Sequence, residues 1–201
     1  SWKIRDGEVT MIKAADLENE YFLVLIPGEE LVETASQVQK IVSEHYNLYP
    51  DQIYPQLHIT IDRITKNKAE RAEKILTQKI KDFDKIKIEV DRFSCIKFSD
   101  QHQLVLEVNE TKSLQKFSES VHQSLIEEGI STIDNYEEWM FHITIISNIF
   151  AENPIPVDEL TEICLFMEGM SRPLAAGAEK LEIWKPTLDP VEKVIASFDL
   201  N

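Results

Sequence analysis

The sequence is poor in glycine and cysteine and has no long apolar run. Its five glycines form no G-x-G-x-x-G fingerprint, no Walker phosphate loop and no G-x-S-x-G nucleophile elbow. The longest apolar run, residues 21–27, falls far short of the ~20 residues that a membrane helix needs. Cys95 and Cys164 lack C-x-x-C spacing, so we expect two reduced, ordinary apolar side chains. We therefore expect a protein without a membrane span, located in the cytoplasm.

Positive charge is scarce as well. The chain of 201 residues carries 21 Lys and Arg against 36 Asp and Glu, which gives a formal net charge of −15. A protein that holds a long duplex by its phosphates needs a broad basic face, so this class of partner is excluded. A small or short anionic substrate remains compatible with the charge. We expect a monomer that binds neither long duplex nucleic acid nor a membrane.

The hydrophobic pattern indicates the same order of elements twice. Apolar runs and alternation predict strands, and apolar positions at helical spacing predict helices. In the first half we expect strand 21–26, helix 31–46, strand 56–62, helix 68–81 and strand 85–90; in the second half strand 104–108, a helix from Thr111 to Gly129, strand 139–147, helix 157–167 and strand 179–185. A hairpin through residues 99–101 joins the halves. The order is β-α-β-α-β in each half, which indicates an internal duplication.

Two of the five histidines lie in identical strings. His58 and His142 each begin His-Ile-Thr-Ile, at the equivalent strand of each half. The other three have ordinary structural explanations: His45 in the last turn of a helix, His102 in a hairpin turn, and His122 beside the apolar stripe of a surface helix. Recurrence at equivalent positions favours a functional interpretation of the two strings over that of hydrogen-bonded core histidines.

Strand geometry predicts how these strings face. Residues two apart share a face, so His58 and Thr60 point one way, as do His142 and Thr144, while the isoleucines point the other way. Two polar pairs on equivalent strands would bring two imidazoles together across a pseudo-twofold cleft. Neither string has a further ligand at metal-binding spacing, so we expect no metal site.

The strings "LHITI" and "FHITI" in a duplicated chain resemble the two-histidine (2H) phosphoesterase superfamily, in its 2′-5′ RNA ligase and cyclic phosphodiesterase branch. The resemblance covers about residues 21–185. It implies an α+β (α/β bilobal) fold of two pseudo-symmetric β-α-β-α-β lobes, with antiparallel-rich sheets flanking a central cleft and without cofactor. We expect one bilobal domain over residues 1–201, with lobe one at about 21–98, lobe two at about 99–185, and additions at 1–20 and 186–201.

The resemblance also implies a reaction. His58 and His142 would catalyse metal-independent hydrolysis of cyclic phosphodiesters, on 2′,3′-cyclic nucleotides or short RNA ends, with Thr60 and Thr144 binding the phosphate. One imidazole would act as base and the other as acid. The alternatives are 2′-5′ RNA ligation at the same site, a non-catalytic module that binds nucleotides or RNA ends, and a purely structural interaction protein.

Two charged residues follow the first string. Asp62 shares strand parity with His58 and Thr60, so we expect it near the substrate, where a carboxylate would raise the pKa of His58 and favour it as the acid, with His142 as base. Arg63 has the opposite parity, so a bulge would be needed to aim it inward.

Four aromatic residues lie near the strings. Tyr54 and Tyr136 are candidates for stacking on a nucleotide base. Trp139 and Phe141 have the strand parity opposite to that of His142, and we expect them in the core.

Overall fold

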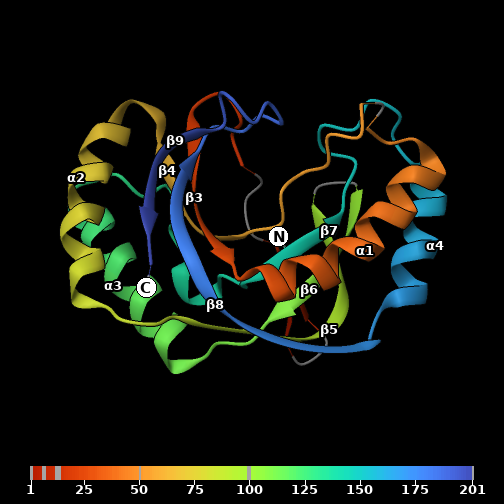
Figure 1. Cartoon of the computed structure of the whole chain (residues 1–201), viewed down its shortest axis with the longest axis horizontal. Helices are drawn as coiled ribbons and strands as arrows, with labels where there is room; N and C mark the ends of the chain where they lie inside the picture. The colour runs from red at the N-terminus through yellow and green to blue at the C-terminus, as the bar shows by residue number, and fades with distance from the viewer. Residues whose placement is uncertain (1, 6–7, 12–14, 50, 99–100, 201) are drawn as a thin grey trace.

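The strands of the protein form a closed antiparallel sheet. The computed structural model describes the chain apart from residues 1, 6–7, 12–14, 50, 99–100 and 201 (Figure 1). Its strands are β1 (Trp2–Arg5), β2 (Glu8–Met11), β3 (Glu20–Pro27), β4 (Ile59–Thr65), β5 (Lys87–Phe98), β6 (Gln101–Val108), β7 (His142–Ile146), β8 (Ser171–Trp184) and β9 (Val194–Asp199). The main sheet has the order β3-β4-β7-β6-β5-β8-β9, and an additional pairing of β3 with β8 closes a six-stranded ring. All its pairings are antiparallel, as expected.

Four α-helices cover this ring in two pairs. They are α1 (Glu29–Tyr46), α2 (Ala69–Lys79), α3 (Lys112–Glu127) and α4 (Val157–Met167). In Figure 1, α2 and α3 lie on one side of the strands and α1 and α4 on the other. Helix α1 contacts β7 and α4 contacts β6, whereas α2 and α3 contact β4. The contacts therefore cross the expected boundary at residues 98 and 99, because α1 packs on a strand of the second half and α3 on a strand of the first.

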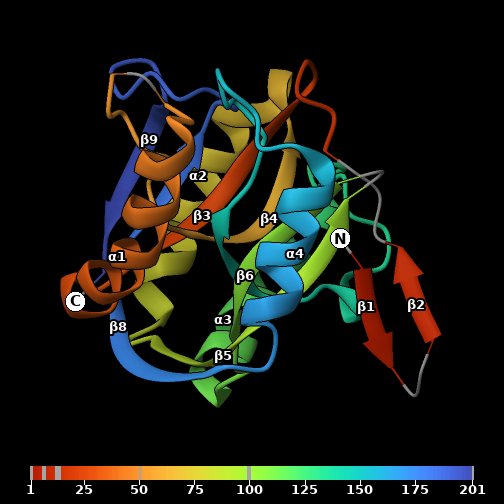
Figure 2. The ribbon, with the colours of Figure 1, turned by 90° about the vertical axis from the view of Figure 1, so that its right-hand side faces the viewer.

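Most predicted elements are confirmed, and their ends follow local chemistry. Thr111 caps α3, its hydroxyl accepting a hydrogen bond from the Leu114 amide. Strands β5 and β8 are longer than predicted, because β5 pairs with two neighbours along its length and β8 with three. The sequence pattern missed β1 and β2, which form their own two-stranded sheet, seen at the edge of the molecule in Figure 2. The predicted hairpin turn at residues 99 and 100 lies outside the described residues.

The ring has two chemically different faces. The helix-covered face carries the main core, to which β3 contributes Leu23 and Leu25 and β8 contributes Leu181 and Ile183. Alternate residues of the same strands form a small separate cluster of Val24, Ile26 and Trp184, with Phe22 packed against it. We call this second face the inner face.

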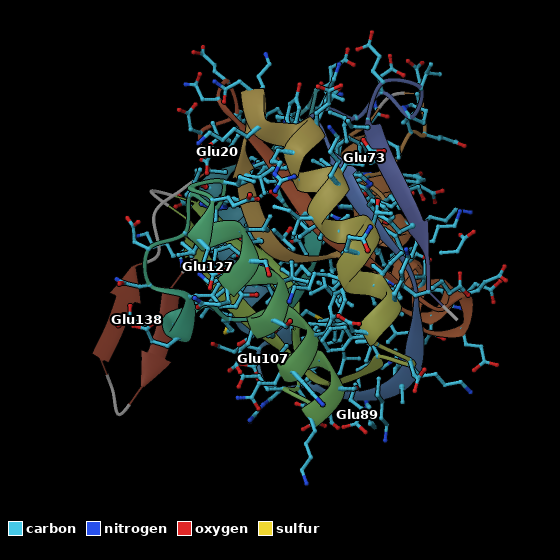
Figure 3. The ribbon with its side chains drawn as sticks, turned by 90° about the vertical axis from the view of Figure 1, so that its left-hand side faces the viewer. Glu20, Glu73, Glu89, Glu107, Glu127 and Glu138 are labelled. Carbon is cyan, nitrogen blue, oxygen red and sulfur yellow. A yellow bond between two sulfur atoms is a disulfide. The ribbon has the colours of Figure 1, made fainter. Side chains whose placement is uncertain are left out.

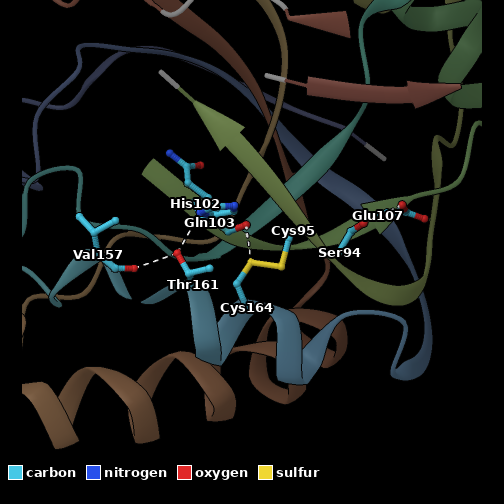
Figure 4. Close-up of a disulfide and its surroundings, with 8 residues drawn as sticks. All are labelled: Ser94, Cys95, His102, Gln103, Glu107, Val157, Thr161 and Cys164. Carbon is cyan, nitrogen blue, oxygen red and sulfur yellow. Dashed lines mark hydrogen bonds between the residues drawn. A yellow bond between two sulfur atoms is a disulfide. The ribbon is translucent and has the colours of Figure 1, made fainter. Parts of the chain in front are cut away.

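The prediction of two reduced cysteines is wrong. Cys95 on β5 and Cys164 on α4 form a disulfide (Figure 4). Cys95 pairs with Leu104, a core residue, so its side chain lies on the helix-covered face beneath α4. Pairing could not be derived from a spacing of 69 residues. Because structural disulfides are typical of oxidising compartments, the cysteines no longer support a cytoplasmic location. Among the described residues, no helix is long and apolar enough to cross a membrane.

Candidate active site

The two His-x-Thr strings meet at one strand pair. Strand β4 contacts β7 through the pairing of Ile59 with Ile143, and both isoleucines are fully buried in the main core. Continuing this antiparallel register sets His58 across from Thr144 and Thr60 across from His142. All four side chains are partly exposed and lie on the face opposite to the isoleucines. The pairing thus forms a local pseudo-twofold arrangement in which each histidine stands across from the other strand's threonine.

Both imidazoles are held in the same way. His58 Nδ1 donates to the Gln56 carbonyl at 2.7 Å, and His142 Nδ1 donates to the Met140 carbonyl at 3.0 Å. A carbonyl can only accept, so Nδ1 carries the hydrogen and Nε2 of the neutral ring carries the lone pair. Burial lowers the pKa of each histidine from 6.5 to about 4. The charge of His58 also lowers the pKa of His142.

The two threonines differ in their partners. Thr144 Oγ1 donates a long hydrogen bond of 3.4 Å to Oε1 of Gln103, a buried residue on β6. For Thr60, the described residues provide no hydrogen bond to the hydroxyl, while its backbone carbonyl accepts one from Trp139 Nε1 at 3.0 Å. Two hydroxyls beside two imidazoles could bind the non-bridging oxygens of a phosphate.

A β-bulge in β4 reverses the predicted orientation of the next two residues. Val24 pairs with Thr60 and Leu23 with Asp62, so Ile61 is the additional residue. Asp62 therefore shares the helix-covered face with Leu23, and Arg63 shares the inner face with Phe22. The expectation that Asp62 contacts substrate is wrong, because strand parity does not survive the bulge.

Asp62 instead anchors a buried polar network. Its fully buried carboxylate accepts hydrogen bonds from the Arg63 amide at 2.8 Å, from Ser131 Oγ at 2.7 Å and from His122 Nδ1 at 2.8 Å. The Tyr136 ring stacks on His122, with centroids 3.9 Å apart. This network stabilises the bulge from the helix-covered face of β4. His122 is thus no ordinary surface histidine, and Asp62 is absent from the causes that shift the pKa of His58.

Arg63 is the cation that the bulge turns toward the histidines. It is 7% exposed, and its guanidinium lies 5.0 Å from the centre of the Trp139 ring. Burial lowers the pKa of Arg63, while Glu20 and Asp62 raise it. Its charge contributes to the lowered pKa of His142. The sequence analysis required a bulge for Arg63 to point inward, and β4 contains one.

The four aromatic residues near the motif strings differ in what they contact. The Tyr136 hydroxyl donates to the Ile61 carbonyl at 2.6 Å and its ring stacks on His122, so this candidate for base stacking belongs to the network around Asp62. Tyr54 packs against Tyr49, with ring centroids 6.2 Å apart, and its stacking on a base stays a prediction. Trp139 and Phe141 are in the core, as predicted.

Sequence reasoning missed three residues near the histidines. The Trp184 ring centroid lies 4.5 Å from that of His58. Lys193 Nζ lies 4.1 Å from the centre of the Trp184 ring. Glu107 is the cross-strand partner of His142. Trp184 lies in the predicted strand 179–185 and Lys193 in the expected addition at 186–201, and no motif in the sequence placed either of them beside His58. The described residues contain no cluster of three or more metal-binding side chains.

Comparisons with known proteins agree with this architecture. No protein-family model and no curated protein matches the sequence. The protein TT0787 of Thermus thermophilus has a TM-score of 0.54 at 14% identity, over 90% of this chain and 97% of that one. A crystal structure described as a phosphoesterase has a TM-score of 0.50 at 10% identity, over 91% and 99%. E. coli LigT complexed with 3′-AMP has a TM-score of 0.50 at 10% identity, over 91% and 98%. At these identities the similarity is one of fold, which this chain shares with the phosphoesterase and with LigT.

Proposed function

We propose that the protein is a metal-independent phosphoesterase that opens cyclic phosphodiesters, of the 2′,3′-cyclic nucleotide or RNA-end type. The observation that carries the proposal is the pairing of Ile59 with Ile143, which sets two His and two Thr side chains together on one face. Each imidazole is neutral near pH 7, because its pKa is lowered, and carries a lone pair on Nε2. Two such groups on opposite sides of a phosphorus can act as base and acid, each contributing about 10²- to 10⁴-fold.

The charges of the site suit a phosphodiester anion. Arg63 and the hydroxyls of Thr60 and Thr144 supply donors that strengthen as charge develops on the non-bridging oxygens. An anion between the imidazoles also raises their pKa values, so that one ring can be protonated when substrate is bound. LigT, whose fold this chain shares, was crystallised with 3′-AMP, and a nucleotide is accordingly our proposed ligand.

The rest of the surface favours a small substrate. The chain carries a net charge of −15, and Figure 3 shows Glu73 and Glu127 among the side chains on the side formed by α2 and α3. A long duplex would meet this charge outside the site, whereas a mononucleotide or a short RNA end would not. We therefore propose a nucleotide or a short RNA end as partner.

The test is a hydrolysis assay on a panel of 2′,3′-cyclic nucleotides and cyclic-phosphate RNA ends, with EDTA present. We expect turnover, with loss of at least about 100-fold in kcat for His58→Asn and for His142→Asn. Asn retains a donor near the position of Nδ1, so folding should be preserved. His102→Asn is the matched control, since His102 forms a hydrogen bond with Thr161 on α4, away from the motif strings.

Three outcomes would reject the assignment. Full turnover by both motif variants would remove the histidines from the chemistry. Loss of turnover on EDTA addition would reject the metal-independent mechanism. Binding of a cyclic nucleotide without product would support a binding module instead.

A further inference from the structure

Two pairs of helices cover the sheet, and only one pair is closed. Helices α2 and α3 pack against each other, whereas α1 and α4, both described along their whole length, make no comparable contact. Helix α1 packs on β7 and α4 on the neighbouring strand β6. Figure 2 views this side of the molecule and shows α1 and α4 standing apart over the strands. The helix layer on this side is therefore open between its two helices.

The space between α1 and α4 is a groove with an apolar lining. Its volume is about 450 Å³, which is typical of binding clefts in proteins. Leu104 of β6, a fully buried core residue, belongs to the lining. The lining consists of six apolar side chains and one acid, with no cation among the described residues: Val38, Val42, Leu104, Glu162, Ile163, Phe166 and Met167.

The groove on the other side of the molecule has the opposite chemistry. Between α2 and α3 the lining is mainly charged and includes Lys74, Lys81 and Glu127, which water can solvate. Helix α4, in contrast, is apolar on its outer side as well as on its buried side, since Leu165 is 58% and Phe166 75% exposed. A helix of this composition is typically covered on both sides. Its exposed apolar side chains therefore indicate a contact with another molecule.

The shape of the lining favours a helix as the occupant. Val38 and Val42 are four residues apart on α1, and the apolar lining residues of α4 are three and four apart, so each set forms a ridge along its helix. A third helix can pack its own ridges between them. Addition of a strand is excluded, because Leu104 lies on β6, which already pairs with β5 and β7 and has no free edge.

The charges beside the groove determine the sign of that helix. Glu162 lines the groove, and Glu159, four residues before Ile163, lies on the same side of α4. All three charged residues of α4 are acids, the third being Asp158. A second copy of this chain would add like charge to a protein whose net charge is already −15, whereas a cationic helix is attracted.

We propose that the groove between α1 and α4 is a docking site for a basic amphipathic helix of a partner protein. The apolar side of that helix fills the groove with residues at helical spacing, and its Lys and Arg residues meet Glu159 and Glu162. The groove lies on the helix-covered face, opposite to the inner face that carries the motif histidines. Docking and the proposed phosphoesterase chemistry thus use separate surfaces, and the inference does not depend on the proposed function.

The first test uses a synthetic peptide as the probe. A labelled helical peptide of about 14 residues, with Leu at spacing i, i+3, i+4 on one side and Lys on the other, should bind wild-type protein with a Kd at or below about 100 μM. Fluorescence anisotropy at an ionic strength of about 0.15 M measures this binding. Phe166→Ser should weaken it at least about 10-fold, because the apolar wall is lost. Leu165→Ser, on the same helix but outside the lining, is the matched control and should change it by less than about twofold.

Three results of this test would overturn the proposal. They are no binding by wild-type protein, equal weakening in the Phe166 and Leu165 variants, and equal binding of a peptide in which Glu replaces Lys. Phe166 is exposed, so its replacement should leave folding intact; Val38→Ser, on the opposite wall, gives the same comparison if the first variant does not fold.

The second test separates the charge of the groove from the charge of the whole protein. Glu162→Gln should weaken peptide binding by about 3- to 10-fold and reduce its salt dependence, whereas Glu168→Gln, an exposed acid outside the lining, should have little effect. Equal effects of both variants would refute the assignment. Sedimentation of wild-type protein without peptide should show a monomer. A dimer that Phe166→Ser dissociates would mean that a second copy occupies the groove, and would overturn the proposal of a basic partner.

Discussion

The two motif strands, β4 and β7, hold their histidines by the same backbone contact but differ in the residues that surround them. In both, the histidine donates from Nδ1 to the carbonyl two residues earlier. Strand β4 then departs into a bulge that is supported by the buried carboxylate of Asp62. Strand β7 has a bulge at the equivalent position, since Val105 pairs with Thr144 and Leu104 with Ile146, but an apolar residue, Ile146, stands there in place of Asp62. This strand is covered by α1, beside α4 and its disulfide. The repeated string therefore accounts for the site geometry that both halves share, while the charges that distinguish the halves come from residues that the string does not include.

The largest effect is expected from removing the Asp62 carboxylate, which distinguishes β4 from β7. We expect Asp62→Ala to lower the free energy of unfolding by about 3 to 5 kcal/mol, since it leaves His122 and Ser131 buried without their acceptor. Urea denaturation measures this loss. Asp134→Ala, at an exposed position, is the matched control and should cost less than about 0.5 kcal/mol.

Asp62→Ala should also affect the opposite face. Without the hydrogen bond from the Arg63 amide to Asp62, β4 can regain regular parity, which would turn the Arg63 side chain toward the core. Binding of a nucleoside 3′-phosphate should weaken even at temperatures where the variant stays folded. Wild-type affinity in the folded variant would show that the bulge does not depend on Asp62.

The disulfide between Cys95 and Cys164 fastens α4 to β5 and so stabilises the side of the sheet that α4 covers. Because it closes a loop of 69 residues, we expect Cys95→Ser/Cys164→Ser to lose about 2 to 4 kcal/mol of unfolding free energy. Nucleotide affinity should stay within about twofold, although Cys164 Sγ lies 3.4 Å from the carbonyl of Gln103, the partner of Thr144 (Figure 4). Calorimetry of oxidised and reduced wild-type protein gives an independent value. A loss of affinity on reduction would show that α4 communicates with the site.

Replacing Arg63 tests whether the orientation that the bulge gives this residue contributes to ligand binding. We expect Arg63→Met to weaken binding of a nucleoside 3′-phosphate by about 10- to 100-fold, because a charge-assisted contact is lost. Lys66→Met removes the same charge from an exposed position just after β4 and should change affinity by less than about twofold. Titration calorimetry compares the two. Equal weakening would mean that Arg63 acts only through long-range charge.

The sequence predicted the elements well because their periodicity is strong and local, as in the apolar stripe of α3. It also predicted the face of His58 and Thr60, since two residues of strand suffice for that. It failed at Asp62, because a one-residue bulge reverses parity and the partners that Asp62 then meets, His122 and Ser131, lie sixty or more residues away. Lys193 was missed for the same reason, because its closeness to His58 depends on how β8 closes the ring onto β3.

The smallest expected effect distinguishes the two threonines. Thr60→Val and Thr144→Val should each lower kcat/KM by about 5- to 20-fold, since valine keeps the shape but cannot donate to a phosphate oxygen. Only Thr144→Val should also cost stability, about 1 kcal/mol or less, because it removes the donor to buried Gln103. Thr→Ser at each position should restore most of the rate. If Thr60→Val lost stability and Thr144→Val did not, Gln103 would not be what holds the Thr144 hydroxyl, and the difference between the two halves would have to be carried by the surrounding charges alone.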